Sequence, residues 1–146
     1  MTATQKEYVS RLVSLVIFGS LARGAATPES DIDMLIIAEN LPLGRMNRVA
    51  VFDRIEEEVR EKNPENAHFE ISPIFKTPEE VRRGSPLFWD MTDHVIILHD
   101  REEFFKNYLV DLKKRLDALG ARRVVRGNAW YWILKDHFTP GEVFEI

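Results

Sequence analysis

Short apolar runs divide the chain into segments of strand length. Residues 13–18 and 95–98 are apolar almost throughout, and residues 31–38 are apolar after their first three positions. Runs of this length and composition are typical of buried strands. Residues 67–75 alternate between apolar and polar, and Pro73 predicts an edge position for this strand, because proline lacks the N–H that a ladder requires. We therefore expect one sheet of about four strands.

Two longer helices are predicted from apolar residues at spacings of three and four. The first should end near Asn63, because a residue that precedes proline is disfavoured in the helical region. The second should be opened by Asp100 and Glu103, acting as a capping box, and stopped by Gly120. Their apolar stripes are, in turn, Met46, Val49, Phe52, Ile55 and Val59, and Phe105, Leu109, Leu112, Leu116 and Leu119.

Three shorter helices complete the expected set of elements. One lies near Val9 at the start of the chain, and another starts at Ser85-Pro86. Thr77-Pro78 and the two acids after it have the capping hydroxyl, proline and first-turn charge of a helix start. Together with the strands, these helices predict an α/β (α+β) fold, with a small mixed sheet of about four strands and helices mainly on one face.

Composition narrows the class of protein. The chain has 146 residues, 45% hydrophobic and 30% charged, which is ordinary for one compact domain. It has no cysteine, which excludes disulfides, thiolate nucleophiles and zinc–thiolate sites. No apolar run approaches the length of a membrane span and no signal sequence is evident, so we expect a cytoplasmic protein.

Charge is distributed unevenly along the chain. The net charge of −4 argues against a general binder of nucleic-acid backbone. A late basic cluster is either a solvated helix face or a surface that meets an acidic partner or a nucleic acid. Its members are Lys113, Lys114, Arg115, Arg122, Arg123 and Arg126.

The candidate chemistry lies around two apolar strands. Asp31 and Asp33 are two residues apart in a predicted strand, so their carboxylates should lie side by side on one face. Paired carboxylates repel each other unless a cation lies between them, and Mg²⁺ favours such oxygen ligands. Gly19 ends the preceding strand where backbone must approach another group closely, and Ser20 adds a hydroxyl and an N–H suited to phosphate oxygens. The pattern indicates a site for a metal–nucleotide complex.

The segment FGSLARGAATPESDIDMLI, residues 18–36, resembles the signature of the DNA polymerase β nucleotidyltransferase superfamily. It is most similar to the minimal prokaryotic branch, which includes antitoxin partners of HEPN toxins. The resemblance implies a nucleotidyltransferase-like fold, an NTP substrate and two Mg²⁺ ions. It implies that Asp31 and Asp33 are catalytic metal ligands and that Gly19, Ser20 and Arg23 bind the nucleotide. Ser30 either contacts phosphate or caps the local turn.

The same resemblance implies a third carboxylate, and Glu70 is the best candidate. It lies in the strand-like segment 67–75, and the alternative is that it lies on a solvated sheet face. Glu79 and Glu80 are poorer candidates, because a helix start already explains them. His68 would share the face of Glu70 and would either touch substrate or be a bystander.

The acceptor of the nucleotide is the least determined part of the hypothesis. Residues 1–120 are expected to form the catalytic domain, and the aromatic tail 121–146 to pack on the core, on a second copy of the chain or on a partner. The leading hypothesis is an antitoxin that transfers AMP from ATP to a hydroxyl, such as that of a tyrosine, on a HEPN toxin. Transfer to an aminoglycoside-like small molecule and a non-catalytic docking antitoxin are the alternatives.

Overall fold

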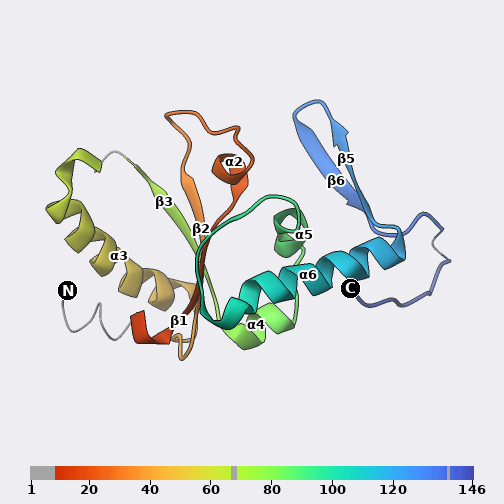
Figure 1. Cartoon of the computed structure of the whole chain (residues 1–146), viewed down its shortest axis with the longest axis horizontal. Helices are drawn as coiled ribbons and strands as arrows, with labels where there is room; N and C mark the ends of the chain where they lie inside the picture. The colour runs from red at the N-terminus through yellow and green to blue at the C-terminus, as the bar shows by residue number, and fades with distance from the viewer. Residues whose placement is uncertain (1–8, 67–68, 138) are drawn as a thin grey trace.

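The computed structural model describes residues 9–66, 69–137 and 139–146. A central sheet has the strand order β3-β2-β1-β4, with β1 antiparallel to both of its neighbours and β2 parallel to β3 (Figure 1). Its strands are β1 (Leu12–Ile17), β2 (Ile32–Ala38), β3 (Ile71–Lys76) and β4 (Ile96–Asp100). The predicted sheet is confirmed, and so is the edge position of the strand that carries Pro73.

The strand boundaries differ from the prediction at two places that matter for the site. Asp31 lies one residue before β2 instead of inside it. The third strand is shorter than expected, since β3 begins only at Ile71 and Glu70 precedes it. Residues 67–68, the first two of the predicted strand, lie outside the described residues.

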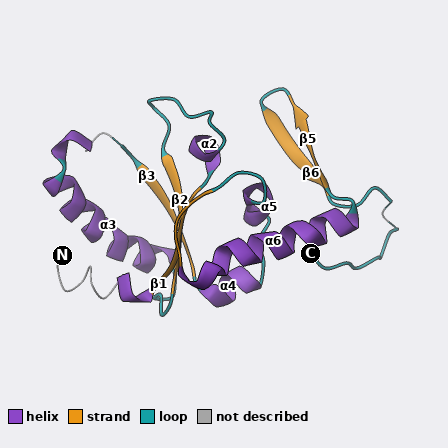
Figure 2. Ribbon diagram, in the orientation of Figure 1, coloured by secondary structure: helices purple, strands orange, loops and turns teal. Residues whose placement is uncertain are grey.

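Helices cover both faces of the sheet (Figure 2). They are α3 (Arg45–Lys62) on one face, and α4 (Pro78–Arg82), α5 (Leu87–Met91) and α6 (Phe104–Leu119) on the other. A four-residue helix, α2 (Gly19–Ala22), follows β1, and two 3₁₀ turns are η1 (Pro64–Asn66) and η2 (Arg101–Glu103). Residues 9–11 are helical, and the residues before them lie outside the description.

Strand β2 supplies apolar side chains to two cores because its residues alternate between the two faces. Leu35 and Ile37 belong to the larger core, which α4, α5 and α6 cover. Ile36 belongs to the smaller core together with Phe52 of α3 and Phe75 of β3, whose rings meet edge to face at 5.7 Å. The central position of β2 thus fixes which face each of its polar residues can reach.

The start of α6 differs from the predicted capping box. Asp100 does cap the helix, but its carboxylate accepts hydrogen bonds from the backbone N–H groups of Phe105 and Lys106, at 3.0 and 2.9 Å. Glu103 instead pairs with the Lys106 side chain. The reason is that η2 intervenes, with Glu102 and Glu103 in the left-handed region, so the helix begins later than the sequence spacing suggests. Gly120 ends α6 in the left-handed conformation, as predicted.

The C-terminal tail forms a hairpin that the sequence pattern did not reveal. Strands β5 (Arg122–Arg126) and β6 (Ala129–Ile133) pair antiparallel as a separate two-stranded sheet. Figure 1 shows the hairpin following α6 and lying on the same side of that helix as α2 and α5. Trp132, Leu134 and Ile146 pack against the larger core. No helix in the described part of the chain is long and apolar enough to cross a membrane.

Glu80 joins α3 to α4 and belongs to the structural framework. Its carboxylate accepts two hydrogen bonds from the Arg48 guanidinium, at 2.8 and 3.0 Å, and one from the backbone N–H of Thr77. The Thr77 hydroxyl in turn accepts from the Glu80 N–H, which completes a capping box. These bonds, above all the one from Arg48, lower the pKa of Glu80. The structural role predicted for this acid is confirmed.

We expect Glu80→Ala to lower the free energy of unfolding by roughly 2 kcal/mol, because it removes a charge-assisted pair and half of a capping box. Glu79→Ala is the matched control: its pair with Arg82 is exposed, so its loss should stay within about 0.5 kcal/mol. Urea denaturation of both variants measures the difference. Because the pKa of Glu80 is lowered in the folded state, the gap between wild type and Glu80→Ala should shrink as the pH falls through that pKa. Equal losses in the two variants would contradict this role.

Candidate active site

Asp33 faces the side of the sheet that α5 and α6 cover. It alternates with Met34 and shares its face with Leu35, whose side chain lies in the larger core. Asp31, two residues earlier, lies close enough for its charge to act on the Asp33 carboxyl. The structure therefore brings the two predicted carboxylates together, although Asp31 precedes the strand and is exposed.

Gly19 leaves the space that the Asp33 carboxylate fills. A Cβ built on Gly19 would lie 2.0 Å from Oδ2 of Asp33, far inside any real contact, and the residue has a φ of +71°. The backbone N–H of Phe18 also donates to the Asp33 carbonyl at 3.0 Å, which ties the end of β1 to β2. Only glycine satisfies both the positive φ and the close approach. The start of α2 and the carboxylate of β2 are thus packed directly together.

The electrostatics of Asp33 fit a cation. Burial raises its pKa most, the neighbouring Asp31 charge raises it further, and the Arg23 charge opposes both effects. A partly buried carboxylate beside a second carboxylate is unfavourable in its ionised form. A divalent cation with oxygen ligands would relieve this repulsion, so the donor set present here suits Mg²⁺.

Glu70 lies beside Asp31, directly before β3 as Asp31 lies directly before β2. The N–H of Ile32 donates to the Glu70 carbonyl at 2.8 Å, and the parallel pairing of Ile32 with Ile71 continues toward Asp31 and Glu70. Glu70 is exposed, and no three His, Asp or Glu side chains within the described ranges converge as a metal-binding group. The backbone of Glu70 therefore lies next to that of Asp31, but the side chains of Asp31, Asp33 and Glu70 do not converge. The role of Glu70 as third ligand stays a prediction. His68 lies outside the described residues.

The loop from α2 to β2 holds the remaining predicted residues. The Ser20 carbonyl accepts from the N–H of Ala25 at 2.9 Å, which closes the chain after α2. The Ser30 hydroxyl accepts from the N–H of Thr27 at 2.9 Å and lies 3.2 Å from the Thr27 hydroxyl. Ser30 thus caps a turn, as the structural alternative predicted, and contact of Ser20 or Ser30 with phosphate stays a prediction.

Arg23 connects the site to the C-terminal hairpin. Its N–H donates to the Gly19 carbonyl at 3.2 Å, and its guanidinium carbon lies 4.8 Å from the centre of the Trp130 ring. Asp90 of α5 holds that ring by accepting from the indole N–H groups of both Trp130 and Trp132, at 3.0 and 2.8 Å. The sequence alone did not indicate that Trp130 and Asp90 lie at this site. The aromatic tail was a visible signal, but its contact with Arg23 spans more than 100 residues.

Substitution of Gly19 tests the contact with Asp33. We expect Gly19→Ala to destabilise the chain by roughly 2–4 kcal/mol, because it combines a left-handed backbone with a clash against a carboxylate. Gly24→Ala is the matched control, since its φ is +69° but nothing lies within 4 Å of its added Cβ. It should cost only about 1 kcal/mol. Urea denaturation gives both values, and equal costs would contradict the packing argument.

Removing the Asp33 charge should stabilise the metal-free protein. The folded-state pKa of Asp33 is raised, so its contribution to stability is favourable at low pH and is lost as the pH rises through that pKa. We expect Asp33→Asn to melt at a higher temperature than wild type at pH 7 in EDTA, and the difference to vanish in acid. Asp53→Asn, which changes an exposed carboxylate on α3, should leave the melting temperature at pH 7 unchanged. A lower melting temperature for Asp33→Asn at pH 7 would refute the argument.

The chain is similar to proteins of known sequence and structure. Over 111 residues the chain is 37% identical to "Putative protein adenylyltransferase MJ1305" of Methanocaldococcus jannaschii, covering 75% of this chain and 73% of that protein. A solved mutant of the MntA–HpeT toxin–antitoxin pair superposes with a TM-score of 0.50 at 13% identity, over 79% of this chain and 85% of that chain. At such low identity this likeness shows the fold alone. The chain also matches the structure of a tri-AMPylated Shewanella oneidensis HEPN toxin in complex with MNT antitoxin, with a TM-score of 0.46 at 13% identity. The match covers 79% of this chain and 82% of that chain.

The sequence model of the nucleotidyltransferase domain matches residues 3–100. That range is more than half of the chain and contains Gly19 and Asp33, which pack together at the start of β2, and Asp31, whose charge acts on Asp33. The predicted family is therefore confirmed: the chain belongs to the nucleotidyltransferase domain family and is a nucleotidyltransferase.

Proposed function

We propose that this nucleotidyltransferase transfers AMP from ATP to a hydroxyl on a partner protein, and that the partner is a HEPN-type toxin for which the chain is the antitoxin. The observation that carries the proposal is the packing of the Asp33 carboxylate into the space left by Gly19. It supports a site in which a metal-binding acid and the backbone of a phosphate-binding turn meet. The name of the Methanocaldococcus jannaschii relative supports protein as the acceptor and AMP as the group transferred.

Asp31 and Asp33 would hold Mg²⁺, with Glu70 as the third ligand of one of two ions. The paired carboxylates, one of which has a raised pKa, are the property of this chain that fits a divalent cation. When bound, Mg²⁺ neutralises charge on the triphosphate and lowers the pKa of the attacking hydroxyl. Glu70 is exposed, so its carboxylate is accessible to a metal ion or to an acceptor group from solvent.

The chain's own groups position the nucleotide for an in-line reaction. Gly19 and Ser20 offer backbone and hydroxyl donors to phosphate oxygens, and Arg23 offers a planar guanidinium to the triphosphate. The acceptor oxygen forms a bond to the α-phosphorus while the bond from that phosphorus to the β-phosphate oxygen breaks. The hydroxyl proton passes to a carboxylate of the site, and pyrophosphate leaves. Catalysis in this scheme is mainly positioning and charge neutralisation. Dependence on ATP suits the cytoplasmic setting expected from the sequence.

The proposal is tested by incubating the purified chain with ATP, GTP, CTP or UTP, Mg²⁺ and a HEPN-type partner, followed by intact mass of both proteins. We expect the partner to gain one or more AMP groups with ATP and Mg²⁺, and none in EDTA. Asp31→Asn and Asp33→Asn should each slow the transfer at least about 100-fold, because each removes a charge that the metal requires. Asp53→Asn, an exposed change on α3, should transfer at the wild-type rate.

The remaining outcomes discriminate between the alternatives. A tight complex that never gains mass with any nucleotide would replace the proposal with a docking antitoxin. Transfer to an aminoglycoside in place of the protein would assign a small-molecule substrate.

A further inference from the structure

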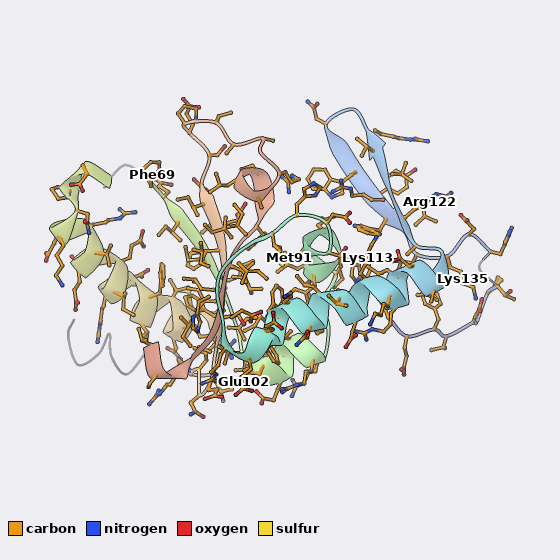
Figure 3. The ribbon with its side chains drawn as sticks, in the orientation of Figure 1. Phe69, Met91, Glu102, Lys113, Arg122 and Lys135 are labelled. Atoms are coloured by element: carbon orange, nitrogen blue, oxygen red, sulfur yellow. The ribbon has the colours of Figure 1, made fainter. Side chains whose placement is uncertain are left out.

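The inner face of the β5–β6 hairpin lies against the candidate site. Arg123, Val125, Trp130 and Trp132 share one face of the hairpin, because Arg123 pairs with Trp132 and Val125 with Trp130. Both indoles of this face donate to Asp90 of α5, so it is the face turned toward the body of the protein. Figure 3 shows side chains filling the space between α2 and the hairpin, with Arg122 on the hairpin's far side in this view.

Two arginines from distant parts of the chain converge on one ring of that face. The guanidinium carbon of Arg23 lies 4.8 Å from the centre of the Trp130 ring, and that of Arg123 lies 6.0 Å from the same centre. Neither guanidinium forms an ion pair within 4 Å with a carboxylate of residues 9–66, 69–137 or 139–146. The Arg23 charge also acts on the Asp33 carboxyl, but without a direct ion pair to either guanidinium the two positive charges around one ring favour binding of an anion.

The position of this arginine pair indicates which anion fits. Arg23 follows Gly19 by one helical turn and its N–H is bonded to the Gly19 carbonyl, and Gly19 packs on Asp33. Arg23 is thus anchored to the turn at which the triphosphate is proposed to bind, and Arg123 approaches it through the Trp130 ring that both face. An aromatic ring beneath a guanidinium fixes its direction while leaving its donors free, which suits binding of phosphate oxygens in planar geometry.

We propose that Arg123 is a second triphosphate-binding residue and that the hairpin forms one wall of the nucleotide site. Arg23 and Arg123 together bind the β- and γ-phosphates of a nucleoside triphosphate, and Trp130, held by Asp90, is the positioning residue for both. This inference rests on the proposed function. It adds residues from beyond residue 100, where the match to the nucleotidyltransferase domain ends.

Isothermal titration with MgATP and with AMP tests the proposal. We expect Arg123→Ala to weaken MgATP binding about tenfold, because it removes one charge-assisted phosphate contact, and to leave AMP binding within about twofold. Arg126→Ala is the matched control, since it removes the same charge from the opposite face of the same hairpin. It should leave both affinities within about twofold of wild type. Arg123→Gln keeps a long polar side chain and should repeat the result if Arg123→Ala folds poorly.

The positioning role of Trp130 has its own readout. Trp130→Leu should weaken MgATP binding in the same direction as Arg123→Ala, and Trp130→Phe should restore most of it, because a phenyl ring still attracts a guanidinium. The double variant Arg123→Ala/Trp130→Leu should lose less than the two single losses combined, since Trp130 acts partly through Arg123.

The outcomes separate this inference from the function on which it rests. If Arg123→Ala and Arg126→Ala weaken MgATP binding equally, Arg123 is not a triphosphate-binding residue. The same holds if Arg123→Ala weakens AMP and MgATP binding equally. Either result would refute this inference and leave the proposed function standing. A wild-type chain that binds no MgATP and transfers no nucleotide would overturn both the inference and the proposed function.

Discussion

The contact between Gly19 and the Asp33 carboxylate is the constraint on which the rest of the site depends. Because no side chain stands at Gly19, the turn after β1 can close directly over β2, and the Oδ2 atom occupies the space of a Cβ. This brings the backbone of α2, the Ser20 hydroxyl and the Arg23 side chain near the Asp31 and Asp33 carboxylates. A partly buried, like-charged carboxylate pair is intrinsically unfavourable. Repulsion between the two carboxylates therefore destabilises the site, and a bound cation would relieve that repulsion.

Strand β2 holds this arrangement in place because both of its faces are packed in hydrophobic cores. Its alternate residues fill the larger core under α5 and α6 and the smaller core under α3, so β2 is clamped on both faces. Asp33 emerges on the side of the larger core, at the end of the strand where Phe18 also bonds to it. A slip of the strand by one residue would turn Asp33 to the other face and bury Met34 in its place, which the two cores forbid.

The hairpin extends the site with residues that come late in the chain. Asp90 accepts from two indoles at once and so joins α5 to β6, while Trp132 packs against Trp89 edge to face at 6.4 Å. These contacts bring Trp130 and Arg123 to a surface formed by the start of the chain. The basic and aromatic character of the tail, which from sequence alone suits a solvated face or a partner surface, thus acquires a definite neighbour in Arg23.

Local sequence determined the elements and the family. The alternation of apolar and polar residues, the proline at the sheet edge, the capping residues of α4 and the glycine that ends α6 act over a few residues, so the sequence predicted them and the structure confirms them. The spacing of Gly19, Asp31 and Asp33 predicted a site for a metal–nucleotide complex for the same reason, and the resemblance of residues 18–36 to a family signature implied a nucleotidyltransferase. Each residue is required by short-range geometry or charge.

Tertiary structure decided what depends on contacts between distant segments. Local pattern placed Glu70 inside a strand, but pairing with β2 starts β3 only at Ile71. A capping box was expected from Asp100 and Glu103, but the turn between the sheet and α6 delays the helix and leaves Asp100 to cap it alone. The convergence of Arg23, Asp90, Arg123 and Trp130 has no local signature, because it depends on how a hairpin packs across a helix and a loop. Spacing along the chain encodes short-range geometry, whereas packing of the whole chain sets which surfaces meet.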